Sequence, residues 1–134
     1  MKILIVDDDL LSREILNDIL TPFGSCLLAK NGQEAVDCFT AAREQGAPFD
    51  VICLDFIMPV MDGVQARKHI RQIEQDAGTA LQDAVKIIMI SSMSDLELIM
   101  MGFDPVCDAY TLKPFDVDQL MGIFAGFGFQ AAGR

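Results

Sequence analysis

The chain has 134 residues, of which 51% are hydrophobic, and its formal net charge is −10. This length allows one domain with a substantial core, and the composition is that of a globular protein rather than a disordered one. The acidic surplus argues against direct binding to nucleic acid or to an anionic membrane, because phosphate groups attract Lys and Arg. It fits divalent-cation binding, although simple solubility explains an acidic surface equally well.

Short apolar runs predict five strands, and several of these runs are apolar at nearly every position. Such runs are typical of strands covered on both faces of a parallel sheet. In chain order the predicted strands are 2–7, 26–30, 50–55, 85–91 and 108–113.

Amphipathic segments between these runs predict five helices. In the first helix Leu11, Ile15 and Ile19 recur four residues apart, and Asp9 is a candidate N-cap. The alternation of strands and helices gives five βα units, which predicts a parallel sheet with helices on both faces and right-handed crossovers. We expect a surface loop at 77–84 and a frayed segment from Gly126 onwards. The predicted helices are 10–20, 33–45, 63–76, 94–102 and 116–125.

The N-terminal segment MKILIVDDD ends in three carboxylates, unlike the apolar region of a signal peptide. The apolar runs are also too short to cross a bilayer, so we expect a cytoplasmic protein without membrane association. The cysteines show no CxxC spacing, and we interpret them as reduced, buried, small hydrophobic residues. They are Cys26, Cys38, Cys53 and Cys107.

Polar side chains stand where the predicted strands end. The first strand ends at Asp7 and Asp8, the third at Asp55, the fourth at Ser91 and the fifth at Lys113. A parallel sheet brings these ends to one edge, where ligands of open α/β sheets bind. Clustered carboxylates repel each other, and Mg²⁺ relieves such repulsion. A cation, an ammonium and a hydroxyl suit a phosphoryl group, with Asp55 as the nucleophile that forms an acyl phosphate.

Four motifs in this order resemble the response-regulator receiver domain. They are the acidic pair Asp7-Asp8, the block LDFIMPVMDG at 54–63, the hydroxyl residue Ser91 and the Lys113-Pro114 pair. The resemblance covers nearly the whole chain and implies a receiver domain over 1–129 with a tail at 130–134. It implies a three-layer, flavodoxin-like (βα)5 fold with a five-stranded parallel sheet of order 2-1-3-4-5.

The resemblance also implies a role for each residue of the acidic site. Asp55 is expected to accept the phosphoryl group, with Mg²⁺, or Mn²⁺ as an alternative, bound by Asp8, Asp55 and the backbone carbonyl of Ile57. Asp7 is expected to bind the metal through water, and Lys113 to pair with the phosphoryl oxygens. The Lys113-Pro114 bond is expected to be cis. Such a domain is a phosphoacceptor that assists its own phosphotransfer and dephosphorylation, and is not counted as an enzyme.

For signal output, the resemblance implies that Ser91 is the switch hydroxyl and that Tyr110 is the aromatic residue that moves with it. The expected phosphodonor is a sensor histidine kinase or a histidine phosphotransfer protein. The face formed by the fourth helix, fifth strand and fifth helix is expected to bind a downstream protein or a second copy of the chain. Segment 94–103 is more apolar than one helix face needs, so it is either a partner surface or a deeply packed helix. The candidate partner residues are Leu96, Ile99, Met100 and Met101.

Three other functions fit the sequence less well. A phosphatase of the haloacid-dehalogenase type needs a second aspartate two residues after the first, but Ile57 stands there. A nucleotide binder needs a glycine-rich phosphate loop, and neither G-x-x-x-x-G-K-[ST] nor a G-x-G-x-x-G after the first strand occurs. A degenerate receiver that only binds proteins would not need the full set of site residues. Ile57 and Met93 flank the expected phosphoryl group and cannot orient water, which predicts a long-lived phosphorylated state.

Overall fold

The computed structural model describes residues 1–56, 58–91 and 108–131. Its five strands form one parallel sheet of order β2-β1-β3-β4-β5, as the sequence predicted. Each predicted strand lies within one residue of its observed position, because the apolar runs end where the sheet ends. The strands are β1 Lys2–Val6, β2 Ser25–Ala29, β3 Val51–Asp55, β4 Lys86–Ser91 and β5 Asp108–Leu112.

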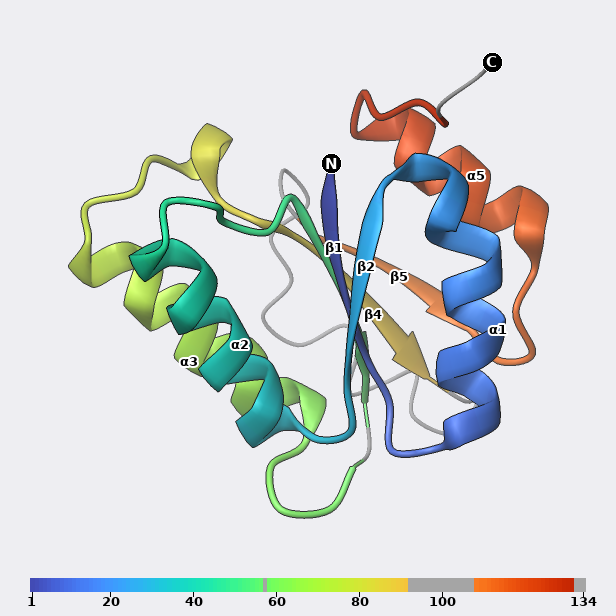
Figure 1. Ribbon diagram of the computed structural model, residues 1–134, viewed down its shortest axis with the longest axis horizontal. Coiled ribbons are helices and arrows are strands. Elements are labelled where there is room, and N and C mark those ends of the chain that lie inside the picture. Colours follow the sequence, from blue (N-terminus) through green and yellow to red (C-terminus); the bar gives the residue numbers. More distant parts are fainter. Residues whose placement is uncertain (57, 92–107, 132–134) are drawn as a thin grey trace.

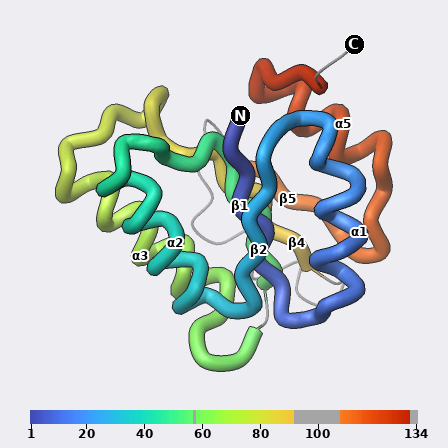
Figure 2. The backbone as a smooth tube through the Cα atoms, in the orientation of Figure 1, coloured from blue at the N-terminus to red at the C-terminus, as the bar shows by residue number. Residues whose placement is uncertain are grey.

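Helices cover both faces of the sheet, which gives three layers (Figure 1). Figure 2 shows α2 and α3 together on one side and α1 and α5 on the other. The predicted helix 94–102 and its partner residues lie outside the described residues. The α-helices are α1 Leu10–Leu20, α2 Gly32–Glu44, α3 Gly63–Asp76 and α5 Val117–Gly126, with 3-10 turns η1 Thr21–Phe23 and η2 Leu81–Asp83.

The sheet divides the core into two apolar clusters. Alternate β1 residues enter opposite clusters: Leu4 and Val6 pack with α2 and α3, whereas Ile3 and Ile5 pack with α1 and α5. All four are fully buried, as expected for a central strand of a covered parallel sheet. The sheet is therefore fixed from both faces, and its carboxyl edge is a rigid platform for the acidic residues.

The apolar stripe that predicted helix 10–20 lies mostly on the outer face of α1. Leu11 is 63% exposed and Ile15 is 39% exposed, whereas Leu16 and Leu20 are fully buried. The four-residue spacing correctly located the helix but did not identify its buried face. Two apolar stripes run along α1, and periodicity alone does not say which of them meets the sheet.

Strand β2 also differs from the prediction that the strands are covered on both faces. It lies at the edge of the sheet, and Leu27 and Leu28 are 47% and 44% exposed. The number of apolar residues in a run cannot distinguish an edge strand from a central one, because both kinds of strand carry β-forming side chains.

Helices α2 and α3 each bury one apolar face, as expected for amphipathic segments. In α2, Ala35, Phe39 and Ala42 are buried, and in α3 Ile70 is buried. Segment 77–84 is mostly exposed, as expected for a surface loop, and includes the short turn η2. The three described cysteines, Cys26, Cys38 and Cys53, are free thiols, but only Cys53 of these is fully buried as predicted, whereas Cys26 and Cys38 are half-buried.

We expected the chain to fray from Gly126 onwards, and this prediction is wrong for the residues that follow α5. Phe127 and Phe129 pack against the core, and the backbone N–H of Phe129 donates a hydrogen bond to the carbonyl of Phe124 at 2.9 Å. The packing of these two aromatic rings holds the segment in place. Each described helix is too short or too polar to cross a bilayer.

A buried ionic network ties α3 to the start of β5. The Asp108 side chain is inaccessible to solvent and pairs with both Arg67 and Arg71. Arg71 also pairs with Glu74 at 2.6 Å, and Glu74 accepts a hydrogen bond from the backbone N–H of Val85 at 2.7 Å. Because these charges are compensated within the network, it fixes α3 against two strands at modest net cost.

Candidate functional site

The end of β1 holds Asp7 in place through its polar atoms. Its backbone N–H donates to the Ala29 carbonyl at 3.1 Å, and its Oδ1 accepts from the Asp9 N–H at 2.9 Å. The Asp7 carbonyl accepts from the Arg13 guanidinium at 2.7 Å. Asp7 is fully buried, whereas its neighbour Asp8 is exposed. One carboxylate is thus fixed and the other faces solvent.

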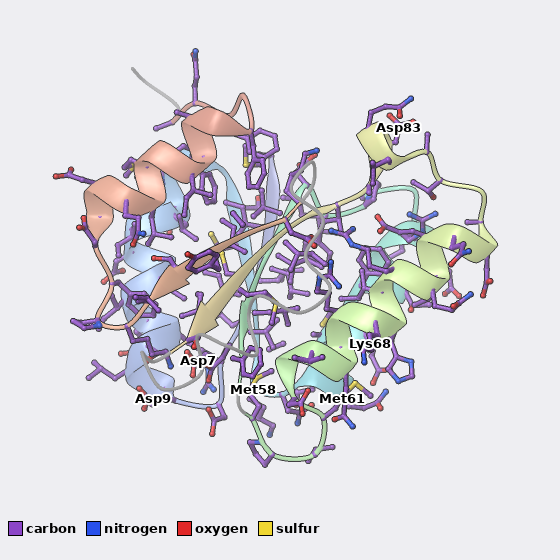
Figure 3. All side chains as sticks on the ribbon, turned by 180° about the vertical axis from the view of Figure 1, so that it is seen from behind. Asp7, Asp9, Met58, Met61, Lys68 and Asp83 are labelled. Atoms are coloured by element: carbon purple, nitrogen blue, oxygen red, sulfur yellow. The ribbon has the colours of Figure 1, made fainter. Side chains whose placement is uncertain are left out.

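Asp9 has a different role from the two preceding aspartates. It is the N-cap of α1, and its side chain accepts hydrogen bonds from the backbone and the hydroxyl of Ser12. These hydrogen bonds lower the pKa of Asp9. The N-cap prediction is confirmed, and Figure 3 shows Asp7 and Asp9 at the same edge of the molecule as Met58.

Asp55 ends β3 at the same edge, with its side chain 9% exposed. The chain then turns and enters α3, which begins with the capping box of Asp62 and Gln65. Gly63 packs so closely that a methyl group there would overlap the Asp55 carbonyl oxygen. The Asp-Gly pair of the motif therefore both starts α3 and allows it to lie against the backbone of Asp55.

Lys113 brings a positive charge to the two buried aspartates. Its Nζ lies 3.0 Å from Asp7 Oδ2 and 3.5 Å from Asp55 Oδ1. The Lys113–Pro114 peptide bond is cis, as the sequence comparison with the family implied. Residues more than a hundred positions apart in the chain thus meet at one point of the sheet edge.

The charges of this cluster shift the pKa values of two members. Burial and the charge of Asp7 raise the pKa of Asp55 to about 7, although Lys113 opposes the shift. Burial works against the charged form of Lys113, but the hydrogen bond to Asp7 and the charges of Asp55 and Asp7 raise its pKa. Near neutral pH, Lys113 is therefore charged and Asp55 is close to its midpoint.

The acidic residues fit a small divalent cation. Asp7, Asp8 and Asp55 each offer a carboxylate oxygen within 4.8 Å of the others. Asp7 Oδ2 is buried and pairs with Lys113 Nζ at 3.0 Å. An oxygen left with acceptor capacity beside two further carboxylates suits a hard cation that keeps several waters, such as Mg²⁺.

Of the remaining predicted site residues, the structure describes Ser91 and Tyr110 but not Ile57. Ser91 ends β4 and is buried, and its carbonyl accepts from the Lys113 N–H at 2.8 Å. Tyr110 lies in β5 and is 40% exposed. Ile57 lies outside the described residues, so its expected carbonyl ligand stays a prediction.

The edge around the acidic cluster carries exposed apolar side chains that the sequence analysis did not identify. Leu10 and Leu11 are 59% and 63% exposed, and Val60 in the loop after β3 is 81% exposed. Val60 also has a φ of 71°, a left-handed conformation that is unfavourable for a β-branched residue. We call Leu10, Leu11, Ile15 and Val60 the apolar rim.

A cavity of about 500 Å³ lies between α1 and the segment that follows β5. It includes Lys113 of the acidic cluster and Ile15 of the apolar rim, so the rim and the site share a wall. Its lining is Ser12, Ile15, Lys113, Pro114 and Phe115.

Fold and site together define an open parallel α/β protein with a cluster of carboxylates and one ammonium at the carboxyl edge of its sheet. The family model for the response regulator receiver domain matches residues 3–125. The chain belongs to the family of response regulator receiver domains of two-component systems.

Relatives of nearly the same length include two from Bacillus subtilis. Chemotaxis protein CheY is 32% identical over 122 residues, which cover 90% of this chain and 91% of CheY. Sporulation initiation phosphotransferase F is 29% identical over 120 residues, which cover 89% of this chain and 86% of that protein.

Solved structures show the same fold in a complex and with a bound metal. The receiver domain of Saccharomyces cerevisiae Ssk1, crystallised with the histidine phosphotransfer protein Ypd1, has a TM-score of 0.76 and 28% identity over 96% of this chain and 88% of that one. Thermotoga maritima TrrA, in complex with Mg²⁺ and a beryllium fluoride, has a TM-score of 0.73 and 28% identity over 94% and 97% of the two chains.

Proposed function

We propose that Asp55 accepts a phosphoryl group from a phosphorylated histidine and that the chain signals through this modification. The observation that carries the proposal is the position of Lys113 Nζ, within ion-pair distance of both Asp7 and Asp55. A lysine held beside a strand-end carboxylate by a second, buried carboxylate stabilises the extra negative charge of a phosphoryl group.

The reaction follows from the groups present. A carboxylate oxygen of Asp55 attacks phosphorus, an O–P bond forms, and the P–N bond of the phosphohistidine breaks with its electron pair going to the imidazole nitrogen. Lys113 donates hydrogen bonds to the phosphoryl oxygens. Because only the ionised carboxyl is a nucleophile, the pKa of about 7 makes the charge state of Asp55 important.

The metal site we propose consists of Asp8, Asp55 and the Ile57 carbonyl, with Asp7 acting through water. Mg²⁺, or Mn²⁺ in its place, would supply positive charge that neutralises the attacking carboxylate and the phosphoryl oxygens. The grouping of Asp7, Asp8 and Asp55 supports this ligand set. The beryllium fluoride complex of the relative TrrA contains Mg²⁺, which agrees with the choice of ion.

For the signal, we propose that phosphorylation draws Ser91 toward the phosphoryl group and that Tyr110 follows. The half-exposed position of Tyr110 on β5 is compatible with two orientations of its ring. The surface formed by segment 94–102, β5 and α5 would then change its affinity for a downstream protein or for a second copy of the chain.

The apolar rim supports a protein as the phosphodonor. Exposed leucines beside a charged site are unfavourable in water but suit an amphipathic helix that presents a histidine. The Ssk1 receiver, a structural neighbour, was crystallised with a histidine phosphotransfer protein. We therefore propose a histidine kinase or a phosphotransfer protein as donor, which would place its apolar side chains on Leu10, Leu11 and Val60.

Phosphorylation with acetyl phosphate tests the proposal without a protein donor. The purified chain is incubated with acetyl phosphate and Mg²⁺, and its intact mass is measured with and without EDTA. We expect one phosphoryl group per chain, acquired only with the metal, and none on Asp55→Asn. Equal labelling of Asp55→Asn would show that another residue accepts the group. Failure of the wild type to be labelled would favour a receiver that acts only as a protein-binding module.

A phosphatase activity is the alternative function, and the number of turnovers with a phosphate ester distinguishes it from a phosphoacceptor. A phosphatase would release phosphate from substrate in many cycles, whereas a phosphoacceptor stops after one phosphoryl group unless its own acyl phosphate hydrolyses. Multiple turnovers of a phosphate ester by the wild type would contradict the proposal.

A further inference from the structure

Arg13 is a cation beside the acidic cluster that forms no ion pair with a carboxylate of the described residues. Its Nη1 donates a hydrogen bond of 2.7 Å to the backbone carbonyl of Asp7, and the side chain is half-buried. The chain has 20 acidic residues for 10 basic ones, so carboxylate partners are abundant. The guanidinium nevertheless contacts a carbonyl at the end of β1.

Arg13 lies at a position where a positive charge does not stabilise its own helix. It is the fourth residue of α1, which begins at Leu10. Positive side chains in the first turn of a helix are unfavourable, because the partial charge at a helix N-terminus is positive. The benefit of Arg13 must therefore come from its contact with Asp7 rather than from helix stability.

The contact completes the anchoring of the Asp7 backbone. The N–H of Asp7 is bound by Ala29, its carbonyl by Arg13, and its Oδ1 by the N–H of Asp9. Asp8 stands between two fixed residues, since Asp9 is itself held as the N-cap of α1. The directions of the Asp7 and Asp8 carboxylates thus depend on a backbone that Arg13 fixes from the helix side.

We propose that Arg13 is a positioning residue of the cation site and keeps the carboxylates of Asp7 and Asp8 in their ligating arrangement. The inference rests on the proposed function, because it concerns the Mg²⁺ site of that proposal. In this proposal Arg13 supports the site without contacting either the metal or the phosphoryl group. Such outer contacts commonly change metal affinity by about tenfold or more.

The direction of the change in Mg²⁺ affinity distinguishes a positioning role of Arg13 from a purely electrostatic one. If Arg13 acted only as a nearby positive charge, its removal would strengthen Mg²⁺ binding, because like charges repel. If Arg13 positions the backbone, its removal weakens binding although a repulsive charge is lost. The two roles thus predict opposite changes in the same dissociation constant.

The test uses Arg13→Met, which keeps an unbranched apolar chain as far as the position of Nε and removes the charge and the donors. The dissociation constant of Mg²⁺ alone is measured by calorimetry at low ionic strength, where electrostatic effects are least screened. The matched control is Lys68→Met, which removes one positive charge from an exposed position of α3. Urea unfolding without Mg²⁺ verifies that each variant is folded.

We expect Mg²⁺ to bind Arg13→Met about tenfold more weakly than the wild type and to bind Lys68→Met as it binds the wild type. Stronger or unchanged binding to Arg13→Met would overturn the inference while leaving the proposed function intact. A wild type that binds no Mg²⁺ would instead contradict the proposed function and this inference with it.

If Arg13→Met does not fold, Arg13→Lys decides the question. Lysine keeps the charge, but its ammonium lies one bond closer to the backbone than Nη1 and cannot make the same contact. Weaker Mg²⁺ binding to Arg13→Lys supports positioning, and binding equal to the wild type contradicts it.

Discussion

The raised pKa of Asp55 predicts that the acidic site destabilises the metal-free fold at neutral and higher pH. In the unfolded chain this carboxyl ionises near 3.8, whereas in the folded chain it ionises near 7. Between these pH values the folded state binds more protons, so the free energy of unfolding falls as the pH rises. Replacing Asp55 by Asn removes this penalty.

The size of the effect follows from the two pKa values. At about 1.36 kcal/mol per pH unit, the interval from 3.8 to about 7 corresponds to about 4 kcal/mol. Because the edge of the sheet faces water, which weakens the repulsion, we expect about half of this, or about 2 kcal/mol. Asp55→Asn should therefore unfold at a higher urea concentration than the wild type at pH 8, with the difference shrinking toward pH 4.

The assay is urea unfolding in EDTA from pH 4 to pH 8, followed by circular dichroism. Mg²⁺ added at pH 8 should stabilise the wild type more than Asp55→Asn, because the metal neutralises the ionised carboxyl. A difference between the two proteins that does not change with pH would refute the electrostatic reasoning. So would a variant that is less stable than the wild type at pH 8.

Three further substitutions test how the fold supports the site. Gly63→Ala should lower stability by about 1–3 kcal/mol and weaken Mg²⁺ binding, because the methyl group displaces the Asp55 backbone; the control Gly122→Ala has open space and should raise the urea midpoint. Val60→Gly should stabilise the chain by about 1 kcal/mol in urea unfolding, since relief of the left-handed φ exceeds the entropy cost of glycine; a lower midpoint would refute this. Asp108→Ala should destabilise by about 3 kcal/mol, because two half-buried guanidinium groups each lose a carboxylate contact; a near-neutral effect in the same assay would contradict it.

Much of the fold was predictable from the sequence because its signals are local. Each strand is an apolar run with a polar residue at its end, and each described α-helix begins at a capping side chain such as Asp9 or Asp62. The meeting of Asp7, Asp55 and Lys113 was also predictable, because parallel strands bring their carboxyl ends to one edge.

Features that depend on the packing of distant segments were not predictable. The outward orientation of Leu11 and the edge exposure of Leu27 depend on which surfaces meet in three dimensions. The contact between Arg13 and the Asp7 carbonyl leaves no pattern in the sequence, because a charged residue on a helix is usually solvated. The burial of Asp108 was not predictable either, because the arginines that pair with it lie 37 and 41 residues away in the sequence.

The central claim is that Asp55, with the metal ligands and Lys113, forms one phosphoacceptor site. A crystal structure of the chain with Mg²⁺ and beryllofluoride tests it most directly. We predict beryllium bonded to an Asp55 carboxylate oxygen, Mg²⁺ bound by Asp8 and Asp55, and Lys113 Nζ donating to a fluoride. Beryllofluoride bound at another residue, or Mg²⁺ held away from Asp8 and Asp55, would contradict the account.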